Sequence, residues 1–392
     1  MTAVILRDAT AAWRDGDAGE HVAAAAAIAG AIAGDAAESE ANGFPTRSIE
    51  RLAAGGLLAA PLPVEAPGAG ARLVDRKHRL ALLRVLAHVG RGSLPVGRLY
   101  EGHVNALALI AAFGTNGQRA AAAAAAAEGS LFAVWNTEVP TDGVRLVAGS
   151  RRGDCTLAGR KAFASGAGHA AIAVVTARDA DGDRQMVLVD LRAKAPAVVQ
   201  GSWRPLGMRP TASLTVDLTG IPVTADALLG GPGDYLRQPA FGGGAVRFCA
   251  VQIGGIEALV DATRHFLRTE QRTEDALQRS RIGEMATRSV GATLWLEAAA
   301  RNAEGLVDDA TVVSFAHLMR GAVEDAALAV LDLAERSVGA RGLLEPHPFE
   351  RMHRDLVHYL RQAAPDAAQI AAGAHVLARE APVCGLWRSA SS

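Results

Sequence analysis

The pattern of hydrophobic and polar residues changes twice along the chain. Apolar residues at helical spacing predict helices in the first third, which ends in a run of eight alanines. After residue 130 the pattern becomes short apolar runs rich in Val, Ile and Thr, separated by turn residues such as Asp142-Gly143 and Asp181-Gly182. From Gly242 onward the helical period returns. We therefore predict an α+β fold with an N-terminal helical domain (residues 1–129), a middle β domain (130–238) and a C-terminal helical bundle (239–392).

The elements expected within these domains follow from the same periodicity. Helices are expected in the first domain over Glu20–Ala41, Ser48–Ala54, Asp75–Val89, Pro95–Phe113 and Gly117–Glu128. Strands of a small barrel or sandwich are expected over Leu131–Val139, Val144–Ala148, Cys155–Leu157, Ala170–Ala177, Gln185–Leu191 and Ser213–Leu218. A four-helix bundle and one shorter helix are expected over Ala245–Ala276, Gln278–Glu304, Asp308–Ser337, Pro348–Gln362 and Ala367–Arg379.

Composition and charge narrow the function classes. A formal net charge of -1 predicts no general attraction to nucleic acid or anionic membranes. Three widely spaced cysteines without a CxxC pair argue against a disulfide framework or a zinc site. The longest apolar stretch, 22–34, is too short to span a bilayer, and charged residues precede it, which is unlike a signal peptide. We expect a cytoplasmic protein without a membrane span.

Four short motifs follow one another in a fixed order across the three regions. They are Asn42-Gly43-Phe44-Pro45 with the nearby Gly56-Leu57-Leu58 and Pro61-Leu62-Pro63, then residues 159–166 (GRKAFASG), residues 206–223 (LGMR to IPV), and residues 349–355 (FERMHRD). In this order and on these predicted elements, they resemble the acyl-CoA dehydrogenase superfamily over nearly the whole chain. The resemblance implies a flavin, FAD or alternatively FMN, bound between the β domain and the bundle. A Rossmann nucleotide site is not indicated, because no GxGxxG loop follows a strand.

The resemblance also implies which residues contact the flavin ring. Thr137 and Glu138 stand where the family has a turn whose main-chain N–H groups stabilise negative charge on the reduced flavin. Phe163 and Ser165 stand where the family packs an aromatic ring beside the flavin and places a hydrogen bond near its N5. The alternative is that these are ordinary strand residues. The residues that follow, 139–143, differ from the family's Gly-Ser-Asp, which weakens the implied thioester contacts.

A second set of residues is implied to reach the flavin of a neighbouring subunit. Arg264, Arg268 and Arg272 recur every four residues and are expected on one helix face that could bind pyrophosphate. The alternative is a solvated face paired with nearby glutamates. Arg336 and Gly339 lie in a segment that resembles the family's adenosine-binding loop. The resemblance therefore implies a homodimer or homotetramer.

The family's catalytic carboxylate is missing at both of its known positions. The position eight residues after Asp355 is Ala363, and the alternative position before Arg247 is Val246. Neither side chain can remove a proton, although abstraction next to a thioester normally needs a positioned carboxylate.

A histidine could substitute for the missing carboxylate. His103 is expected on a helix that forms one wall of the family's substrate cavity, where monooxygenase relatives often carry a histidine. The alternative is a buried structural histidine bonded to a carbonyl. His358, Tyr359 and Arg361, near the missing carboxylate, are further candidates.

Three functions remain open on this evidence. The first is a flavin-dependent oxidoreductase that oxidises a small-molecule substrate, an acyl-CoA or acyl carrier thioester, through an atypical base and passes electrons to an electron-transfer flavoprotein. The second is a two-component monooxygenase that uses O2 and reduced flavin from a separate flavin reductase. The third is an inactive paralogue. Because the family as a whole acts mainly on acyl thioesters, the first function is slightly favoured for the class of substrate.

Overall fold

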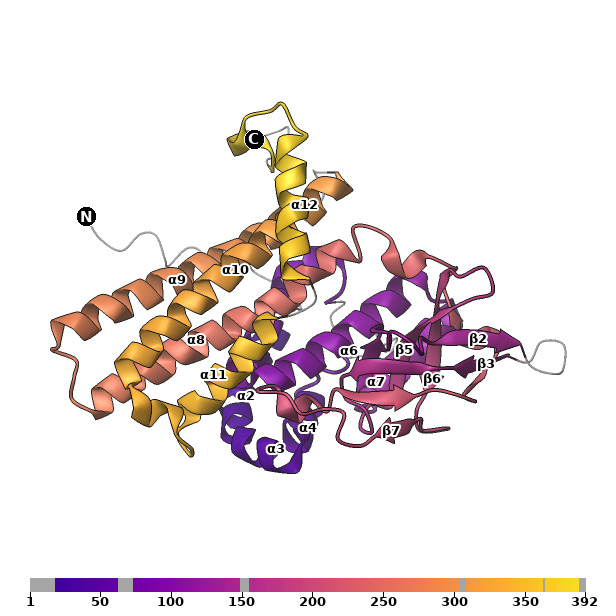
Figure 1. Ribbon diagram of the computed structural model, residues 1–392, viewed down its shortest axis with the longest axis horizontal. Helices are drawn as coiled ribbons and strands as arrows, with labels where there is room; N and C mark the ends of the chain where they lie inside the picture. Colours follow the sequence, from indigo (N-terminus) through magenta and orange to yellow (C-terminus); the bar gives the residue numbers. More distant parts are fainter. Residues whose placement is uncertain (1–17, 63–72, 149–154, 303–307, 362–363, 388–392) are drawn as a thin grey trace.

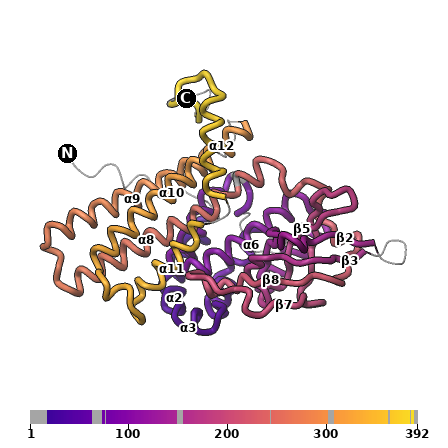
Figure 2. Tube along the Cα trace, viewed as in Figure 1, coloured from indigo at the N-terminus to yellow at the C-terminus, as the bar shows by residue number. Residues whose placement is uncertain are grey.

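A computed structural model describes residues 18–62, 73–148, 155–302, 308–361 and 364–387. Helices of the first third lie between a β region and a C-terminal bundle, as Figure 1 shows. Figure 2 traces the chain from these helices through the β region into the bundle. The predicted α+β class, with helical N- and C-terminal regions around a central curled sheet, is confirmed.

The N-terminal region consists of helices joined by turns and loops over its described residues. Its helices are α2 (Gly19–Gly34), α3 (Ala36–Asn42), α4 (Thr46–Ala54), η2 (Arg76–His78), α5 (Arg79–Gly92), α6 (Leu94–Phe113) and α7 (Asn116–Ala127). The single helix expected over 20–41 is wrong: it breaks at Asp35, whose buried carboxylate accepts a 2.7 Å hydrogen bond from Arg51 Nε. This long-range ion pair cannot be seen in local periodicity.

The middle region forms two sheets. Its strands are β1 (Phe132–Trp135), β2 (Arg145–Ala148), β3 (Cys155–Ala158), β4 (Arg160–Ala164), β5 (Ile172–Arg178), β6 (Arg184–Asp190), β7 (Ala197–Val199), β8 (Leu214–Asp217), β9 (Pro222–Val223) and β10 (Leu228–Leu229). One sheet has seven strands in the order β10-β6-β5-β2-β3-β9, with β1 parallel to β5 off this path. The other has three strands in the order β4-β8-β7. Sequence periodicity missed β4, which lies in the motif at residues 159–166, and it missed the shorter β7, β9 and β10, whose runs of two or three residues carry no readable period.

The C-terminal region begins with α8 (Ala245–Thr269). It continues with α9 (Ala276–Asn302), α10 (Asp309–Val338), α11 (Pro348–Leu360) and α12 (Pro365–Leu377), with short 3-10 turns at Ala340–Leu343 and Val383–Gly385. The expectation that α8 reaches residue 276 is wrong. The helix ends at Thr269, Gln271 adopts a positive φ of 55°, and Arg272 therefore lies beyond the helix.

The N-terminal helices and the bundle share one hydrophobic core, whereas the β region has its own. Two glycines make the contact between α5 and α8 possible. A Cβ on Gly254 would lie 2.0 Å from the Ala87 carbonyl oxygen, and one on Gly90 would lie 2.3 Å from that of Val251. Because larger residues would force these helices apart, both positions require glycine for close backbone approach.

Within the described part of the chain, no single helix combines the length and apolar character needed to cross a membrane. The pair α2 and α3 together reaches that length and composition, but the two helices are bent by 59° at their junction. No group of His, Cys, Asp or Glu side chains among these residues could hold a metal ion.

Candidate functional site

A β-bulge presents Phe163 at the surface of the three-stranded sheet. The register between β4 and β8 shifts between Lys161 and Ala164, and Phe163 adopts a φ of 52°. A positive φ is unfavourable for an aromatic residue and persists only where the surroundings impose it, which is common at binding sites. The Phe163 ring is 60 % exposed, although rings of this size are usually buried.

An aromatic row connects this bulge to the bundle. The rings of Phe163 and Trp203 meet edge to face with centroids 6.0 Å apart, and Trp203 meets His358 of α11 in the same way at 5.5 Å. Trp203 is fixed by a 3.1 Å hydrogen bond from Nε1 to the Arg209 carbonyl, and a cavity of about 480 Å³ adjoins it. Burial lowers the pKa of His358, which therefore favours the neutral imidazole.

A chain of hydroxyl groups lies beside the aromatic row. Ser165 Oγ and Ser213 Oγ are 2.9 Å apart, and Ser213 Oγ lies 2.7 Å from Thr211 Oγ1, which donates to the Met208 carbonyl at 2.8 Å. Trp135 Nε1 donates to the Ser165 carbonyl at 3.0 Å and so holds its backbone. Since a hydroxyl both donates and accepts, Ser165 Oγ can serve either as a hydrogen-bond donor or as an acceptor for a bound polar group.

The segment that carries Thr137 and Glu138 lies directly against the bulge. Ala162 N donates to the Thr137 carbonyl at 3.0 Å, and the Thr137 side chain is exposed. The structure thus brings Thr137 together with Phe163 and Ser165, as expected. The Glu138 carboxylate is occupied otherwise: it accepts from Lys161 Nζ at 2.6 Å and from Val144 N at 2.9 Å. Burial lowers the pKa of Lys161 to about 8, against the opposing effect of Glu138.

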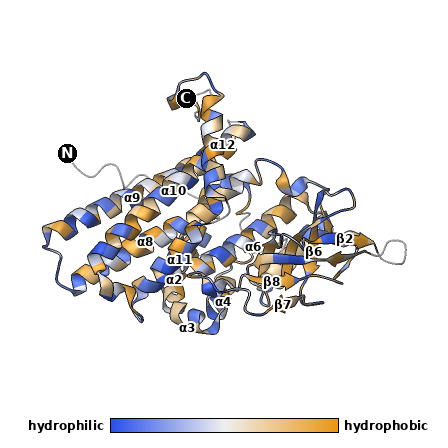
Figure 3. Cartoon of the chain, in the orientation of Figure 1, coloured by the Kyte–Doolittle hydropathy of each residue, from blue (hydrophilic) through white to orange (hydrophobic). Residues whose placement is uncertain are grey.

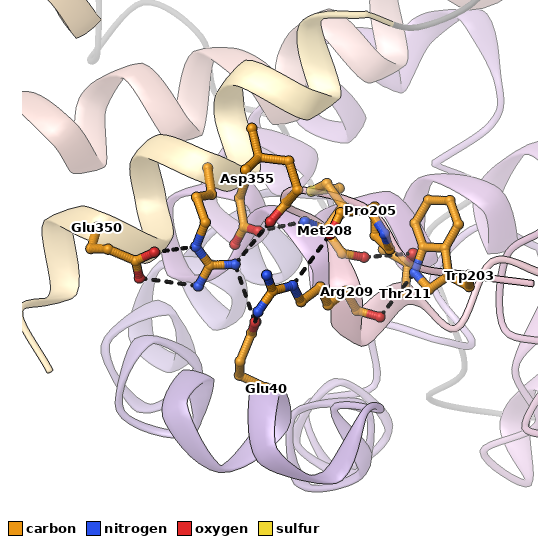
Figure 4. A network of polar contacts seen from close by, with 10 residues as sticks. Glu40, Trp203, Pro205, Met208, Arg209, Thr211, Glu350 and Asp355 are labelled. Carbon is orange, nitrogen blue, oxygen red and sulfur yellow. Dashed lines mark hydrogen bonds and ion pairs between the residues drawn. The ribbon is translucent and has the colours of Figure 1, made fainter. Parts of the chain in front are cut away.

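A polar network fastens the loop of Trp203 to α11 and α3 (Figure 4). Arg354 forms a bidentate ion pair with Glu350 and also donates to Glu40 Oε1 at 3.2 Å and to the Leu206 carbonyl at 3.1 Å. Met208 N donates to Asp355 Oδ1 at 2.5 Å. The network therefore joins all three regions of the chain next to the aromatic row.

The buried carboxyl of Asp355 and the tight turn at Gly207 complete this junction. Burial raises the pKa of Asp355 to about 7, against the hydrogen bond from Met208 N. A Cβ on Gly207 would lie 2.0 Å from the Arg354 carbonyl oxygen, so the loop can approach α11 only with glycine at this position.

The surroundings of His103 match the structural alternative and not a catalytic role. The side chain is fully buried, its Nε2–H donates to the Leu58 carbonyl at 2.8 Å, and its Nδ1 accepts from Phe132 N at 3.1 Å. These bonds fix a neutral imidazole with both nitrogens occupied, and burial lowers its pKa to about 4. We expected His103 to act on substrate; this geometry does not support that role, because neither nitrogen is available.

His103 is expected to make the protein less stable in acid. Its folded-state pKa of about 4 lies below the ordinary 6.5, so its contribution to stability is complete above pH 6.5 and falls as the pH drops towards 4. The loss approaches about 1.4 kcal/mol per pH unit in that window. His103→Asn should flatten this part of the pH dependence of the free energy of unfolding, whereas His265→Asn, at an exposed position of α8, should leave it unchanged. An unchanged slope in His103→Asn would contradict the assignment.

The residues expected to reach a partner's flavin gather at the far end of the bundle. Arg268, near the end of α8, is exposed, and Arg272 donates to the Ser337 carbonyl at 3.5 Å and pairs with Asp275 at 3.2 Å. Arg336 is exposed and pairs with Asp332 at 3.0 Å, and Gly339 ends α10 with a φ of 67°. Figure 1 shows this end of α8 and α10 on the opposite side of the molecule from the β region. Their role in binding a partner's flavin stays a prediction.

A second polar group lies on α6, between the β region and the bundle. Glu101 is buried and accepts hydrogen bonds from Arg98 and Asn105, and Arg247 of α8 donates to Asn105. The hydroxyl of Tyr359 on α11 is buried without a hydrogen-bond partner and interacts electrostatically with Arg98 and Glu101. We call Arg98, Glu101, Asn105, Arg247 and Tyr359 the arginine cluster.

Of the two positions at which the family carries its catalytic carboxylate, Val246 is among the described residues. Val246 is on α8, is 4 % exposed and belongs to the shared core. Ala363 lies outside the described residues.

Sequence reasoning missed Trp203, Ser213, Lys161 and most of the arginine cluster. Arg98, Glu101 and Asn105 could have been found, because their spacing of three and four residues places them on one face of a helix that is otherwise mostly apolar. Trp203 lies in an irregular loop and carries no such signal.

Comparisons with known proteins agree with this architecture. Residues 22–130 match the family model described as "Acyl-CoA dehydrogenase, N-terminal domain", and residues 233–360 match "Acyl-CoA dehydrogenase, C-terminal domain". A dibenzothiophene monooxygenase of Rhodococcus erythropolis is 28% identical over 95% of this chain and 96% of its own length. A putative acyl-CoA dehydrogenase of Bacillus subtilis, YdbM, is 27% identical over 88% of this chain and 92% of its own.

Solved structures show the same fold. FMN-bound TdsC from Paenibacillus sp. A11-2 superposes with a TM-score of 0.81 at 19% identity, over 94% of this chain and 100% of that chain. Methanesulfinate monooxygenase MsuC from Pseudomonas fluorescens superposes with a TM-score of 0.78 at 19% identity, over 94% and 99% of the two chains.

Proposed function

Because this chain belongs to the acyl-CoA dehydrogenase family, we propose that it is a flavin-dependent monooxygenase of that fold and not an acyl-CoA dehydrogenase. The observation that carries the proposal is the composition of the bulge site. Phe163, Trp203, Ser165 and Ser213 provide aromatic and hydroxyl contacts, and the titratable side chain that joins the row is the half-buried His358. The curated relatives that match nearly the full chain include dibenzothiophene monooxygenases, which supports the same reading.

The residues fit a flavin ring well. Phe163 is a large apolar ring held in the open by a strained backbone, and the hydroxyl chain ends beside it at Ser165. The cofactor that we propose is FMN, since the structural neighbour TdsC has been solved with FMN bound. When bound and reduced, the flavin would supply the electrons that activate O2. Ser165 would hydrogen-bond the polar edge of the ring, and Phe163 and Trp203 would exclude water from it.

His358 is the residue that we propose to hold a proton beside the reacting groups. It faces Trp203, and burial lowers the pKa of its imidazole, so it can accept or donate a hydrogen bond as a neutral group. Tyr359, the other candidate expected in this segment, is buried on the next position of α11 and belongs to the arginine cluster.

The proposal includes two partners. Reduced flavin would come from a separate flavin reductase. A second copy of the chain would contribute Arg268, Arg272, Arg336 and Gly339 to the flavin phosphates. Exposed apolar residues on α9 and α10, including Val290, Leu294 and Leu328, support association of copies through the bundle. Figure 3 shows hydrophobic segments alternating with hydrophilic ones along both helices.

Phe163→Ala is expected to weaken FMN binding by about tenfold to a hundredfold, because an apolar ring of this size contributes about 1.5–3 kcal/mol when it is covered. Titration of FMN followed by its fluorescence measures the dissociation constant. Val147→Ala, at a 37 % exposed apolar position on β2, is the matched control and should bind FMN as the wild type does. Equal affinities of Phe163→Ala and wild type would remove the bulge from the flavin site.

A further inference from the structure

The arginine cluster carries an excess of positive charge in a largely buried place. Arg98 and Glu101 form an ion pair, and both oxygens of Glu101 are occupied, one by Arg98 and one by Asn105. Arg247 donates from Nε to the Asn105 amide oxygen, and no described carboxylate forms a salt bridge with it. Two guanidinium groups thus share one carboxylate, and burial lowers the pKa of Arg247. A partly buried guanidinium that forms no salt bridge with any carboxylate of the described residues is unfavourable and points to an anion that completes the cluster.

The Tyr359 hydroxyl is a second and independent sign of a missing ligand. Tyr359 is 2 % exposed, and its hydroxyl has no hydrogen-bond partner. Burial raises the pKa of Tyr359, and the nearby charges of Glu101 and Arg98 act on it in opposite directions, so the hydroxyl lies within electrostatic range of the cluster. An unpaired buried hydroxyl costs free energy in the free protein, and a negatively charged acceptor beside Arg98 would remove that cost.

Space for the rest of a ligand adjoins Arg247. A cavity of about 200 Å³ is bounded by Arg247, by Asp75 and Arg79, and by a wall that is otherwise apolar and includes Leu82 and Val104. Its size suits a small molecule, and its wall suits an apolar body attached to the anionic group.

The cluster lies close to the proposed flavin site. Leu99, next to Arg98, has its Cδ2 only 3.6 Å from where a Cβ of Gly166 would be, and Gly166 follows Ser165. Tyr359 follows His358, which contacts Trp203. The cluster and the proposed flavin site are therefore built on the same two helices, α6 and α11.

We propose that Arg247, Arg98 and Tyr359 bind the anionic group of a small organic acid, a carboxylate or sulfonate, whose apolar part occupies the adjoining cavity. Binding itself follows from the cluster alone. The identification of this acid as the substrate rests on the proposed monooxygenase function.

Calorimetric titration of the flavin-free protein with benzoate, benzenesulfonate and the neutral benzamide tests the site. The wild type should bind at least one of the two anions tenfold or more tightly than benzamide. Arg247→Gln should lose that preference and bind benzamide as before, whereas Arg247→Lys should recover part of it. Arg288→Gln, at an exposed position of α9, should behave as wild type. No preference for either anion in the wild type, or an unchanged preference in Arg247→Gln, would overturn the proposal.

Tyr359→Phe separates ligand binding from a structural role. Removal of an unpaired hydroxyl should leave the melting temperature of the free protein unchanged or higher, while the affinity for the preferred anion falls severalfold. A lower melting temperature with unchanged anion affinity would show that the hydroxyl serves the fold. Flavin binding is measured separately and tests the monooxygenase proposal. The anion titrations use flavin-free protein, so their result does not depend on that proposal.

Discussion

Butyryl-CoA and octanoyl-CoA are expected to leave the absorbance of the bound flavin unchanged under anaerobic conditions. Removal of a general base typically slows a reaction by about 10²–10⁴, and both positions of the family's carboxylate hold alanine or valine. Val246 lies in the apolar core at 4 % exposure, and Ala363 likewise has no ionisable group. A change of pH therefore cannot supply the base at either position.

Dithionite is the control for this experiment, because it reduces flavin without a catalytic base. It should bleach the same sample fully and so show that the bound flavin is reducible. Ala363→Glu restores a carboxylate at the family position and should still give no bleaching by either acyl-CoA if the site is built for oxygen. Rapid bleaching of the wild-type flavin by butyryl-CoA would show that another residue serves as the base.

Arg354→Gln is expected to lower the free energy of unfolding by about 3–5 kcal/mol. The side chain of Arg354 is 10 % exposed and pairs with Glu350 and Glu40 (Figure 4). Its removal leaves Glu350 without its cation and leaves Glu40 paired with the more exposed Arg209. The oxygen Glu40 Oε2 already has no hydrogen-bond partner, which makes the loss harder to offset. Urea denaturation of both proteins measures the difference.

Arg209→Gln is the matched control, since Arg209 also pairs with Glu40 Oε1 at 3.2 Å but its side chain is 49 % exposed. Its loss should cost about 0–1 kcal/mol, as is usual for exposed ion pairs. Equal effects of the two substitutions would show that the buried junction between the loop and α11 does not depend on Arg354.

Much of the fold could be read from local sequence signals. The helix predicted over 117–128 is found as α7, whose start is fixed by a capping box between Thr115 and Gln118. Its position depends only on neighbouring residues, and the prediction is confirmed to within one residue. The break at Asp35 and the early end of α8 depend on tertiary contacts or on one left-handed residue, Gln271, which periodicity does not report.

Site residues that lie in family motifs could be predicted from the sequence, whereas residues positioned by irregular loops could not. Thr137, Phe163 and Ser165 lie together because β4 and the end of β1 are neighbours, as the family motifs implied. Trp203 reaches Phe163 only through an irregular loop held by the Arg354 network. His103 has the residue type of a catalytic group, but both of its ring nitrogens are bonded to backbone groups of distant residues, which the sequence does not show.

The reaction of the reduced FMN-bound protein with O2, followed in a stopped-flow spectrometer, tests the proposed function most directly. A monooxygenase site delays the return to oxidised flavin, so we predict two absorbance phases, the first dependent on the O2 concentration and the second independent of it. Two results together would contradict the proposal: a single O2-dependent phase with the rate of free FMN, and bleaching of the bound flavin by an acyl-CoA.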